Sequence, residues 1–286
     1  MSRIFDTHFH VLNFDKPDQK TALLGMDKYR IDRLAMLAEE PIYTLKSYRD
    51  IREHNKGRMD RLFQWCDGSD GRLLPIWWVN TTDPDAMQQV DEALDRGAVG
   101  FKVITETTMP GDGHALQVYQ RMADAGKSIL FHTGICWDWA DMGNFNRPCN
   151  WECMMNVEHA RFAAGHVSWP WTDECLAVYG KFNSLKWHPK YSGQEMYLDL
   201  TPGTPDNYRQ KMLNTYYDVC YDGMNEHLLF GTDFGTEIFH DGPDAAKRIV
   251  DRAKQDTELL LKAGFTQETV DKILYQNSMD FWGLKD

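Results

Sequence analysis

Two histidines and an aspartate occupy alternate positions in the segment FDTHFH, residues 5–10. Alternation is the period of a β-strand, whose successive side chains point to opposite sides. Asp6, His8 and His10 therefore share one face of the predicted strand. The other face is apolar and holds Phe5, Phe9 and Val11. Because an unpaired polar atom costs about 1–3 kcal/mol in a protein interior, the polar face predicts either a bound group or an edge strand in contact with solvent.

Further ionisable side chains lie at or near the ends of later apolar segments, and they are Lys102, His132, His166 and Asp233. Imidazole nitrogens with a carboxylate are suitable donors for Zn²⁺ or another divalent first-row metal, which lowers the pKa of a bound water to about 7. The repeated placement favours a cation held by His8 and His10 over the edge strand. Asp6 is expected to support this site rather than to bind the metal.

Short apolar segments must position these side chains. Eight of them occur, at residues 4–10, 32–38, 73–80, 98–104, 128–134, 163–169, 195–200 and 227–233. Most are separated by helix-like stretches such as residues 84–97, which have Pro near the start and Gly at the end. Strands that alternate with helices predict a parallel α/β sheet, and eight such units match the (β/α)₈ TIM barrel, whose active site lies at the C-terminal strand ends. An open doubly wound sheet or a distorted barrel is the alternative, because segments 32–38 and 195–200 are weakly apolar.

The length of 286 residues is typical of one such barrel, and no repeat or linker interrupts the pattern, so we expect a single domain over residues 1–286. Long loops are expected after the first and fifth strands, at residues 13–31 and 134–153. Loops of this length on the catalytic face usually shape the pocket.

The net charge of −12, with scattered acids, argues against nucleic acid or an anionic membrane as a partner and favours a small-molecule substrate. The six cysteines form no CxxC pair and indicate a reducing compartment. No apolar run approaches the roughly 18–20 residues of a membrane span, and the first residues leave no room for a cleavable signal. We therefore expect a cytoplasmic enzyme, and homo-oligomerisation is left open.

Six motifs follow one another along nearly the whole chain: DTHFH, GAVGFKV, ILFHTG, GHVSWPW, LLFGTDFG and KILYQNSMDFWG. In this order they resemble the amidohydrolase superfamily, in particular the amidohydrolase-2 branch of metal-dependent TIM-barrel hydrolases, which includes aminocarboxymuconate semialdehyde decarboxylase. The resemblance implies one divalent metal, Zn²⁺ first and Mn²⁺ second. Its implied ligands are His8, His10, His132 and Asp233.

The resemblance also implies roles for two other residues. His166 would polarise the substrate carbonyl or, in a two-metal site, bind the second ion. Lys102 would meet an anionic substrate or, as a carboxylated side chain, bridge two metals. The SWPW segment after His166 departs from the Gly-rich turn of many relatives, and Trp169 is expected to narrow the pocket mouth.

The expected reaction is hydrolysis of a small ester, lactone or amide, in which Asp233 takes a proton from metal-activated water and returns it to the leaving group. Decarboxylation or hydration of a small aromatic or unsaturated carboxylic acid is the alternative, because a fold does not choose a reaction. A barrel that keeps the metal without catalysis is a third hypothesis. Arg147 is expected to bind a carboxylate. Four tryptophans are expected to pack on a flat substrate, and they are Trp137, Trp139, Trp151 and Trp169.

Overall fold

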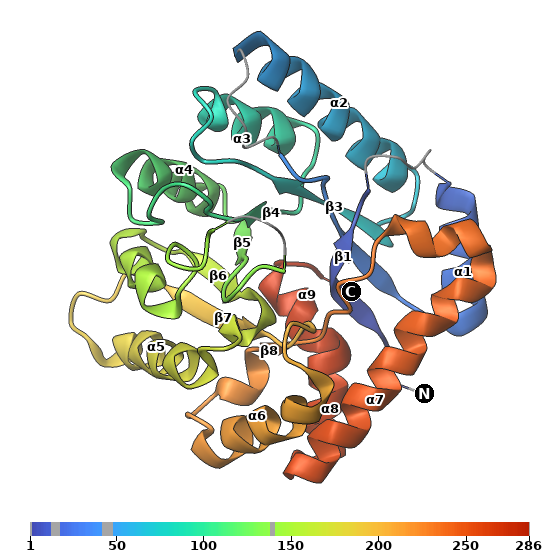
Figure 1. The fold of residues 1–286 in the computed structure, drawn as a ribbon, viewed down its shortest axis with the longest axis vertical. Helices are drawn as coiled ribbons and strands as arrows, with labels where there is room; N and C mark the ends of the chain where they lie inside the picture. The colour runs from blue at the N-terminus through green and yellow to red at the C-terminus, as the bar shows by residue number, and fades with distance from the viewer. Residues whose placement is uncertain (1, 13–17, 42–47, 138–140, 286) are drawn as a thin grey trace.

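The computed structural model describes residues 2–12, 18–41, 48–137 and 141–285. Eight parallel strands form one sheet in sequence order (Figure 1). They are β1 (Phe5–His10), β2 (Arg33–Leu37), β3 (Leu73–Trp78), β4 (Gly100–Val103), β5 (Ser128–Phe131), β6 (Arg161–Ala164), β7 (Glu195–Asp199) and β8 (Leu228–Leu229). All eight predicted strands are therefore confirmed, including the two weakly apolar ones.

Backbone hydrogen bonds join the last strand region to the first. The Thr7 N–H donates to the Phe230 carbonyl at 3.0 Å, and the Asp233 N–H donates to the His8 carbonyl at 3.0 Å. This contact brings the two sheet edges together into a nearly closed (β/α)₈ barrel. The predicted barrel is thus confirmed, and the open doubly wound sheet is wrong.

Helices surround the strands (Figure 1). They are α1 (Gln19–Tyr29), α2 (Tyr48–Cys66), α3 (Ala86–Asp95), α4 (Gly113–Asp124), α5 (Thr172–Ser184), α6 (Asp206–Val219), α7 (Lys247–Ala263), α8 (Gln267–Asp271) and α9 (Asn277–Phe281). Helix α3 lies within the predicted stretch 84–97. Helix α1 occupies much of the long loop that was predicted at residues 13–31. The long connection after β5 is present and leads into a 3₁₀ helix at Pro148–Asn156.

Two apolar clusters form the core. The larger one includes Phe9 and Val11 and reaches into the surrounding helices, whereas the smaller one includes Phe5 together with residues of six other strands. Strict alternation predicted that Phe5, Phe9 and Val11 share one face of β1. Phe5 instead packs in a different cluster from Phe9 and Val11. The physical reason is a shift in the β1–β2 register between Asp6 and Phe9, which breaks the two-residue period.

The C-terminal segment contributes to the smaller cluster through Tyr275, Met279, Phe281 and Trp282. The Trp282 ring packs so closely on Gly100 of β4 that a Cβ at this glycine would lie 2.2 Å from a ring carbon. Trp282 Nε1 also donates to Thr7 Oγ1 at 2.7 Å. The segment that carries the last motif, KILYQNSMDFWG, thus packs against the strands, and the opposite, C-terminal ends of the strands carry the polar side chains.

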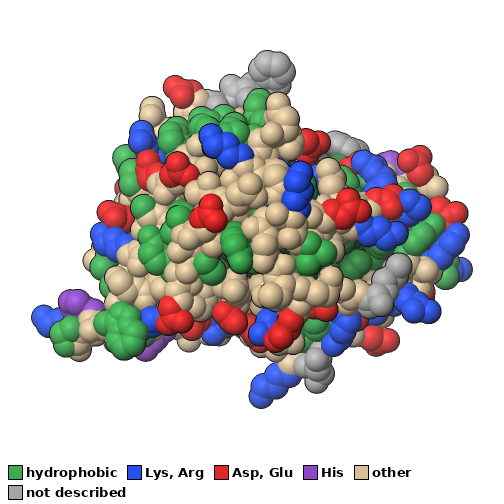
Figure 2. Space-filling view, turned by 90° about the horizontal axis from the view of Figure 1, so that it is seen from below, with side chains coloured by type: hydrophobic (Ala, Val, Ile, Leu, Met, Phe, Trp, Pro, Cys, Tyr) green, Lys and Arg blue, Asp and Glu red, His purple; other side chains and the backbone are tan. Residues whose placement is uncertain are grey.

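Among the described helices, none combines the length and the apolar character needed to cross a membrane. Acidic and basic side chains are interspersed over the face drawn in Figure 2. This mixed surface agrees with a small-molecule substrate.

Candidate active site

A cavity of about 280 Å³ opens at the C-terminal ends of the strands. Its wall contains every ionisable residue that the sequence placed at a strand end: His8, His10, Lys102, His132, His166 and Asp233. These residues are up to 225 positions apart in the chain, and the barrel brings them together because all its parallel strands end on the same side.

Three side chains converge most closely. Donor atoms of His8, His10 and Asp233 all lie within 4.8 Å of one another. Asp233 Oδ1 is 3.1 Å from His10 Nε2 and 3.5 Å from His8 Nε2. Burial by itself would raise the pKa of Asp233, but the charge of His166 and the hydrogen bond with His10 hold that pKa well below its usual range. Asp233 is therefore a carboxylate, and its side chain is 38% exposed on the cavity wall.

His132 at the end of β5 is buried, and its Nε2 has no hydrogen-bond partner among the described residues. Burial, followed by the nearby His166 and Lys102, lowers the pKa of His132 well below the usual value, so that the ring is neutral. A buried neutral imidazole nitrogen without a partner is suited to a cation. The side chains of His8, His10 and Asp233, with His132 in the same cavity, thus fit a divalent metal.

His166 lies in a tight turn that follows β6. The strand ends at Ala164, earlier than the predicted segment 163–169, and His166, Val167 and Ser168 all have positive φ angles. The turn is anchored because Thr133 Oγ1 donates to the Gly165 carbonyl at 2.6 Å. Backbone strain of this kind is often found where a side chain must be aimed at a functional site.

A hydrogen bond to a backbone carbonyl defines the orientation of the His166 ring. Nδ1 is 2.9 Å from the Pro202 carbonyl oxygen, which can only accept, so Nδ1 carries a proton. Nε2 is then left for the cavity, whose wall His166 helps to form.

Lys102 on β4 is only 1% exposed, and its Nζ is 3.3 Å from His8 Nε2. Burial lowers the pKa of Lys102 to about 8, against the opposing charges of Asp233 and Asp199. The amine therefore changes its charge close to neutral pH. It also lies 6.0 Å from the ring centroid of Trp78, which forms part of the same cavity wall.

The tryptophans of the wall are only partly those that were predicted. Trp137 is 77% exposed and lies at the cavity, whereas Trp139 lies outside the described residues. Trp78, which the sequence analysis did not single out, is a wall residue whose ring centroid is 5.9 Å from that of His10. The sequence did contain a signal for this position, because Trp78 lies near the C-terminal end of the apolar segment 73–80.

Two predicted substrate contacts need correction. Trp151 is 1% exposed and stacks on Phe131 with 4.0 Å between ring centroids, because the 3₁₀ helix after β5 turns it into the core. Trp169 packs on Tyr208 at 4.5 Å between centroids and is not among the cavity residues. Neither ring lies on the cavity wall.

The predicted role of Arg147, binding a carboxylate of the substrate, also needs correction. Its guanidinium is half exposed and pairs with Glu174 of α5 at 2.9 Å, so this arginine is engaged outside the cavity. Among the described cavity residues, Lys102 is the one side chain of Lys or Arg type.

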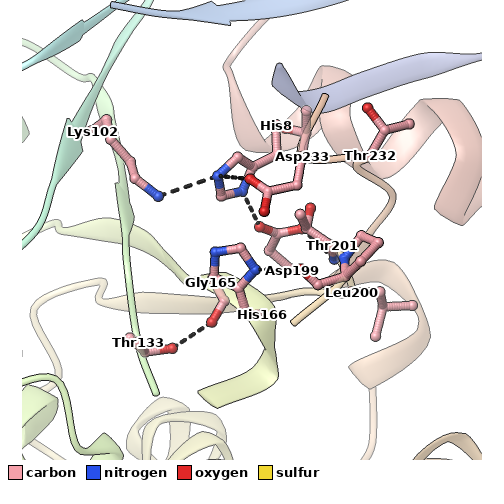
Figure 3. Close-up of polar contacts among 12 residues, drawn as sticks. His8, Lys102, Thr133, Gly165, His166, Asp199, Leu200, Thr201, Thr232 and Asp233 are labelled. Carbon is pink, nitrogen blue, oxygen red and sulfur yellow. Dashed lines mark hydrogen bonds and ion pairs between the residues drawn. The ribbon is translucent and has the colours of Figure 1, made fainter. Parts of the chain in front are cut away.

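Two fully buried carboxylates contact residues of the site or the backbone beside them. Asp199, the last residue of β7, contacts His8 and was missed by the sequence analysis, although an acid at the end of the segment EMYLDL was a usable signal (Figure 3). Asp6 was expected to be supporting, and its carboxylate accepts from the backbone N–H groups of His8 and Thr232. Asp6 therefore ties β1 to the segment that carries Asp233.

The amidohydrolase family model, Amidohydro_2, matches residues 5–284. The chain thus belongs to the amidohydrolase family of metal-dependent enzymes, as the order of its motifs predicted. A search of curated proteins gives no match.

Solved structures of similar fold include a 5-carboxyvanillate decarboxylase from Sphingomonas paucimobilis, 12% identical with a TM-score of 0.65 and 100% of each chain covered. A probable 2-pyrone-4,6-dicarboxylic acid hydrolase from Acinetobacter baumannii is 14% identical with a TM-score of 0.60, covering 98% of this chain and 99% of that one. A 5-carboxyvanillate decarboxylase from Novosphingobium aromaticivorans, solved with manganese, is 10% identical with a TM-score of 0.63, covering 99% and 97%. At these identities the likeness shows the fold, and the neighbours include both hydrolases and decarboxylases.

The corrected position of Trp151 leads to a prediction. We expect Trp151→Ala to lower the free energy of unfolding by about 3–5 kcal/mol, because it leaves a large cavity against Phe131. KM should stay within about twofold of the wild-type value, because the ring does not reach the active-site cavity. Chemical denaturation and steady-state kinetics check the two parts, and a large rise in KM without loss of stability would restore Trp151 as a substrate contact.

Proposed function

We propose that this chain is a metal-dependent hydrolase of a small ester, lactone or amide. The observation that carries the proposal is the position of the Asp233 carboxylate, 3.1 Å from His10 Nε2 and 3.5 Å from His8 Nε2 on the wall of a small cavity. A carboxylate in this position is suited to accept a proton in a reaction. The cavity of about 280 Å³ suits a substrate of limited size.

The proposed cofactor is one divalent cation, Zn²⁺ or Mn²⁺, held by His8, His10, His132 and Asp233. The convergence of three donor groups and the unpartnered Nε2 of His132 support this set. Such a cation supplies Lewis acidity toward a water molecule and a carbonyl oxygen. Two cations bridged by a carboxylated Lys102 are the alternative arrangement.

The side chains then have distinct tasks. Asp233 Oδ1 faces both histidines, which leaves Oδ2 to accept the proton of the attacking water and to return it to the leaving group. His166, fixed through Nδ1 by the Pro202 carbonyl, presents Nε2 to the substrate and, when protonated there, donates to the carbonyl oxygen. Trp78 and Trp137 offer aromatic surface to the rest of the substrate.

Decarboxylation or hydration of an aromatic or unsaturated acid is the second candidate. The buried Lys102 amine beside Trp78 favours it, since this pair suits a carboxylate attached to a flat group. A decarboxylase must anchor the carboxylate and also stabilise the carbanion that remains. The pairing of Arg147 with Glu174 removes the other cationic candidate, and hydrolysis is therefore preferred.

A paired substrate screen tests the choice. One panel holds lactones, esters and amides, and the other holds aromatic and unsaturated acids, with CO₂ release recorded for both and with Zn²⁺ or Mn²⁺ added. We expect turnover in the first panel that is lost in Asp233→Asn. Turnover confined to the second panel, with CO₂ evolution lost in Asp233→Asn and His166→Ala, would replace the hydrolase by the lyase.

We also propose a cytoplasmic location. All six cysteines are free thiols, which fits a reducing compartment.

A further inference from the structure

His8, the most deeply buried histidine of the site, contacts the carboxylate of Asp199. Asp199 Oδ2 is 2.7 Å from His8 Nδ1, and both side chains are fully buried (Figure 3). On its other edge, the imidazole presents Nε2 to Lys102 Nζ at 3.3 Å and to Asp233 Oδ1 at 3.5 Å. His8 therefore connects Asp199 with the centre of the proposed metal site.

The hydrogen bonds around Asp199 define its acceptor role. Its other oxygen, Oδ1, already accepts from the Thr201 backbone N–H at 2.9 Å and from the Thr201 hydroxyl. With both Thr201 donors on Oδ1, Oδ2 is left to accept from His8.

A carboxylate oxygen only accepts, so at 2.7 Å from Asp199 Oδ2 the Nδ1 of His8 carries a proton and donates to it. When Nε2 carries no proton, its lone pair faces Lys102. The same lone pair faces an oxygen of Asp233, a contact that becomes favourable only when positive charge lies between the two atoms. The Lys102 ammonium or a metal ion meets this requirement.

We propose that Asp199 is a positioning residue, whose carboxylate keeps the proton of His8 on Nδ1 and so reserves Nε2 for a cation. The inference rests on the metal of the proposed function and is independent of whether the reaction is hydrolysis or decarboxylation. Carboxylates that hold the far nitrogen of a metal-binding histidine usually change metal affinity by about 10- to 100-fold.

Arg209 of α6 holds the backbone next to Asp199 in place. The carbonyl of Leu200 accepts from Arg209 Nη2 at 2.6 Å, and the same guanidinium binds both oxygens of Asp256 on α7 at 2.9 and 3.0 Å. On the inner side, Gly231 allows the close approach, because a Cβ there would lie 2.1 Å from Thr201 Oγ1 and 2.7 Å from His8 Cβ. The segment after β7 is therefore packed closely against His8.

The variant Asp199→Asn separates the tautomer effect from the shape of the site. Thr201 presents two donors to one oxygen of Asp199, so the amide oxygen of the asparagine has to stay there. The amide NH₂ then faces His8 Nδ1 and can only donate, which forces the ring proton onto Nε2. The size of the side chain is nearly unchanged.

The test uses metal-free full-length protein with ¹⁵N-labelled histidine, and the His8 resonances are identified by their loss in His8→Gln. We expect the Nδ1–H tautomer in the wild-type protein and the Nε2–H tautomer in Asp199→Asn. Titration with Zn²⁺ against a chromogenic chelator should show an affinity that is about 10- to 100-fold lower in the variant.

The matched control is Asp83→Asn, which changes another buried aspartate that accepts from Asn55 and Gln89 and lies outside the cavity wall. It should leave the His8 tautomer and the Zn²⁺ affinity unchanged. An Nε2–H tautomer in the wild-type protein would overturn the inference even if Asp199→Asn does not fold, and so would a folded variant with unchanged tautomer and affinity. Failure of both substrate panels would refute the proposed reaction but would leave this result intact.

Discussion

We expect Asp233→Asn to lower kcat by about 100- to 10,000-fold, the range by which a positioned acid–base group usually accelerates a reaction. The amide keeps an oxygen that can face the metal, but it cannot accept a proton. The loss should therefore be far larger in turnover than in metal content. Steady-state kinetics at saturating Zn²⁺ or Mn²⁺, together with elemental analysis of the same preparation, measure the two quantities.

The contacts of Asp233 explain why Asp233→Asn should affect turnover far more than metal content. Its Oδ1 lies near His8 and His10, and an amide oxygen in the same place preserves a similar shape. Thermal unfolding of the metal-free variant checks that the β8 region is intact. Near-normal turnover in a variant that holds the metal would remove Asp233 from the role of base.

The second large effect is expected for His8→Ala and His10→Ala, which should lose metal and activity together. Each substitution removes one of the three donors that lie within 4.8 Å of one another. The fall in metal affinity should exceed the roughly 10- to 100-fold that is typical for the loss of a supporting residue such as Asp199. Elemental analysis and chelator competition measure it without any substrate.

A histidine far from the cavity provides the control. His227, directly before β8, bonds to Tyr179 Oη through Nδ1 at 2.9 Å and does not line the active-site cavity. His227→Ala should keep the wild-type metal content. Full metal content and activity in His8→Ala and His10→Ala would refute the proposed centre.

The fold was largely predictable because its signals are local. Each strand appears in the sequence as a short apolar segment, and each crossover helix needs a stretch of its own, as α3 between residues 84 and 97 illustrates. The predicted boundaries were less accurate where the chain leaves regular geometry. Segment 163–169 was assigned to a strand, but His166 and its neighbours form a left-handed turn whose anchor, Thr133, belongs to another part of the chain.

The candidate site was predictable to the extent that strand ends determine it. His10 ends β1, whereas His132 and Asp233 follow β5 and β8, and parallel strands in a barrel place all such ends around one opening. The aromatic residues were harder to place, because a tryptophan in a loop can turn either way. Trp151 lies against Phe131 in the core, whereas Trp78, at a strand end, lies on the cavity wall.

The sequence by itself determined the barrel, the family and the polar residues that meet at the strand ends, since these follow from periodicity and from the order of short motifs. The tertiary structure alone decided which side chains touch. The contact between Asp199 and His8 joins residues 191 positions apart, and no local pattern contains it. The same holds for Arg147, which pairs with Glu174 because α5 happens to present a carboxylate there. Such pairings depend on the packing of whole elements. That packing makes Asp199 a partner of His8 and Glu174 a partner of the surface Arg147.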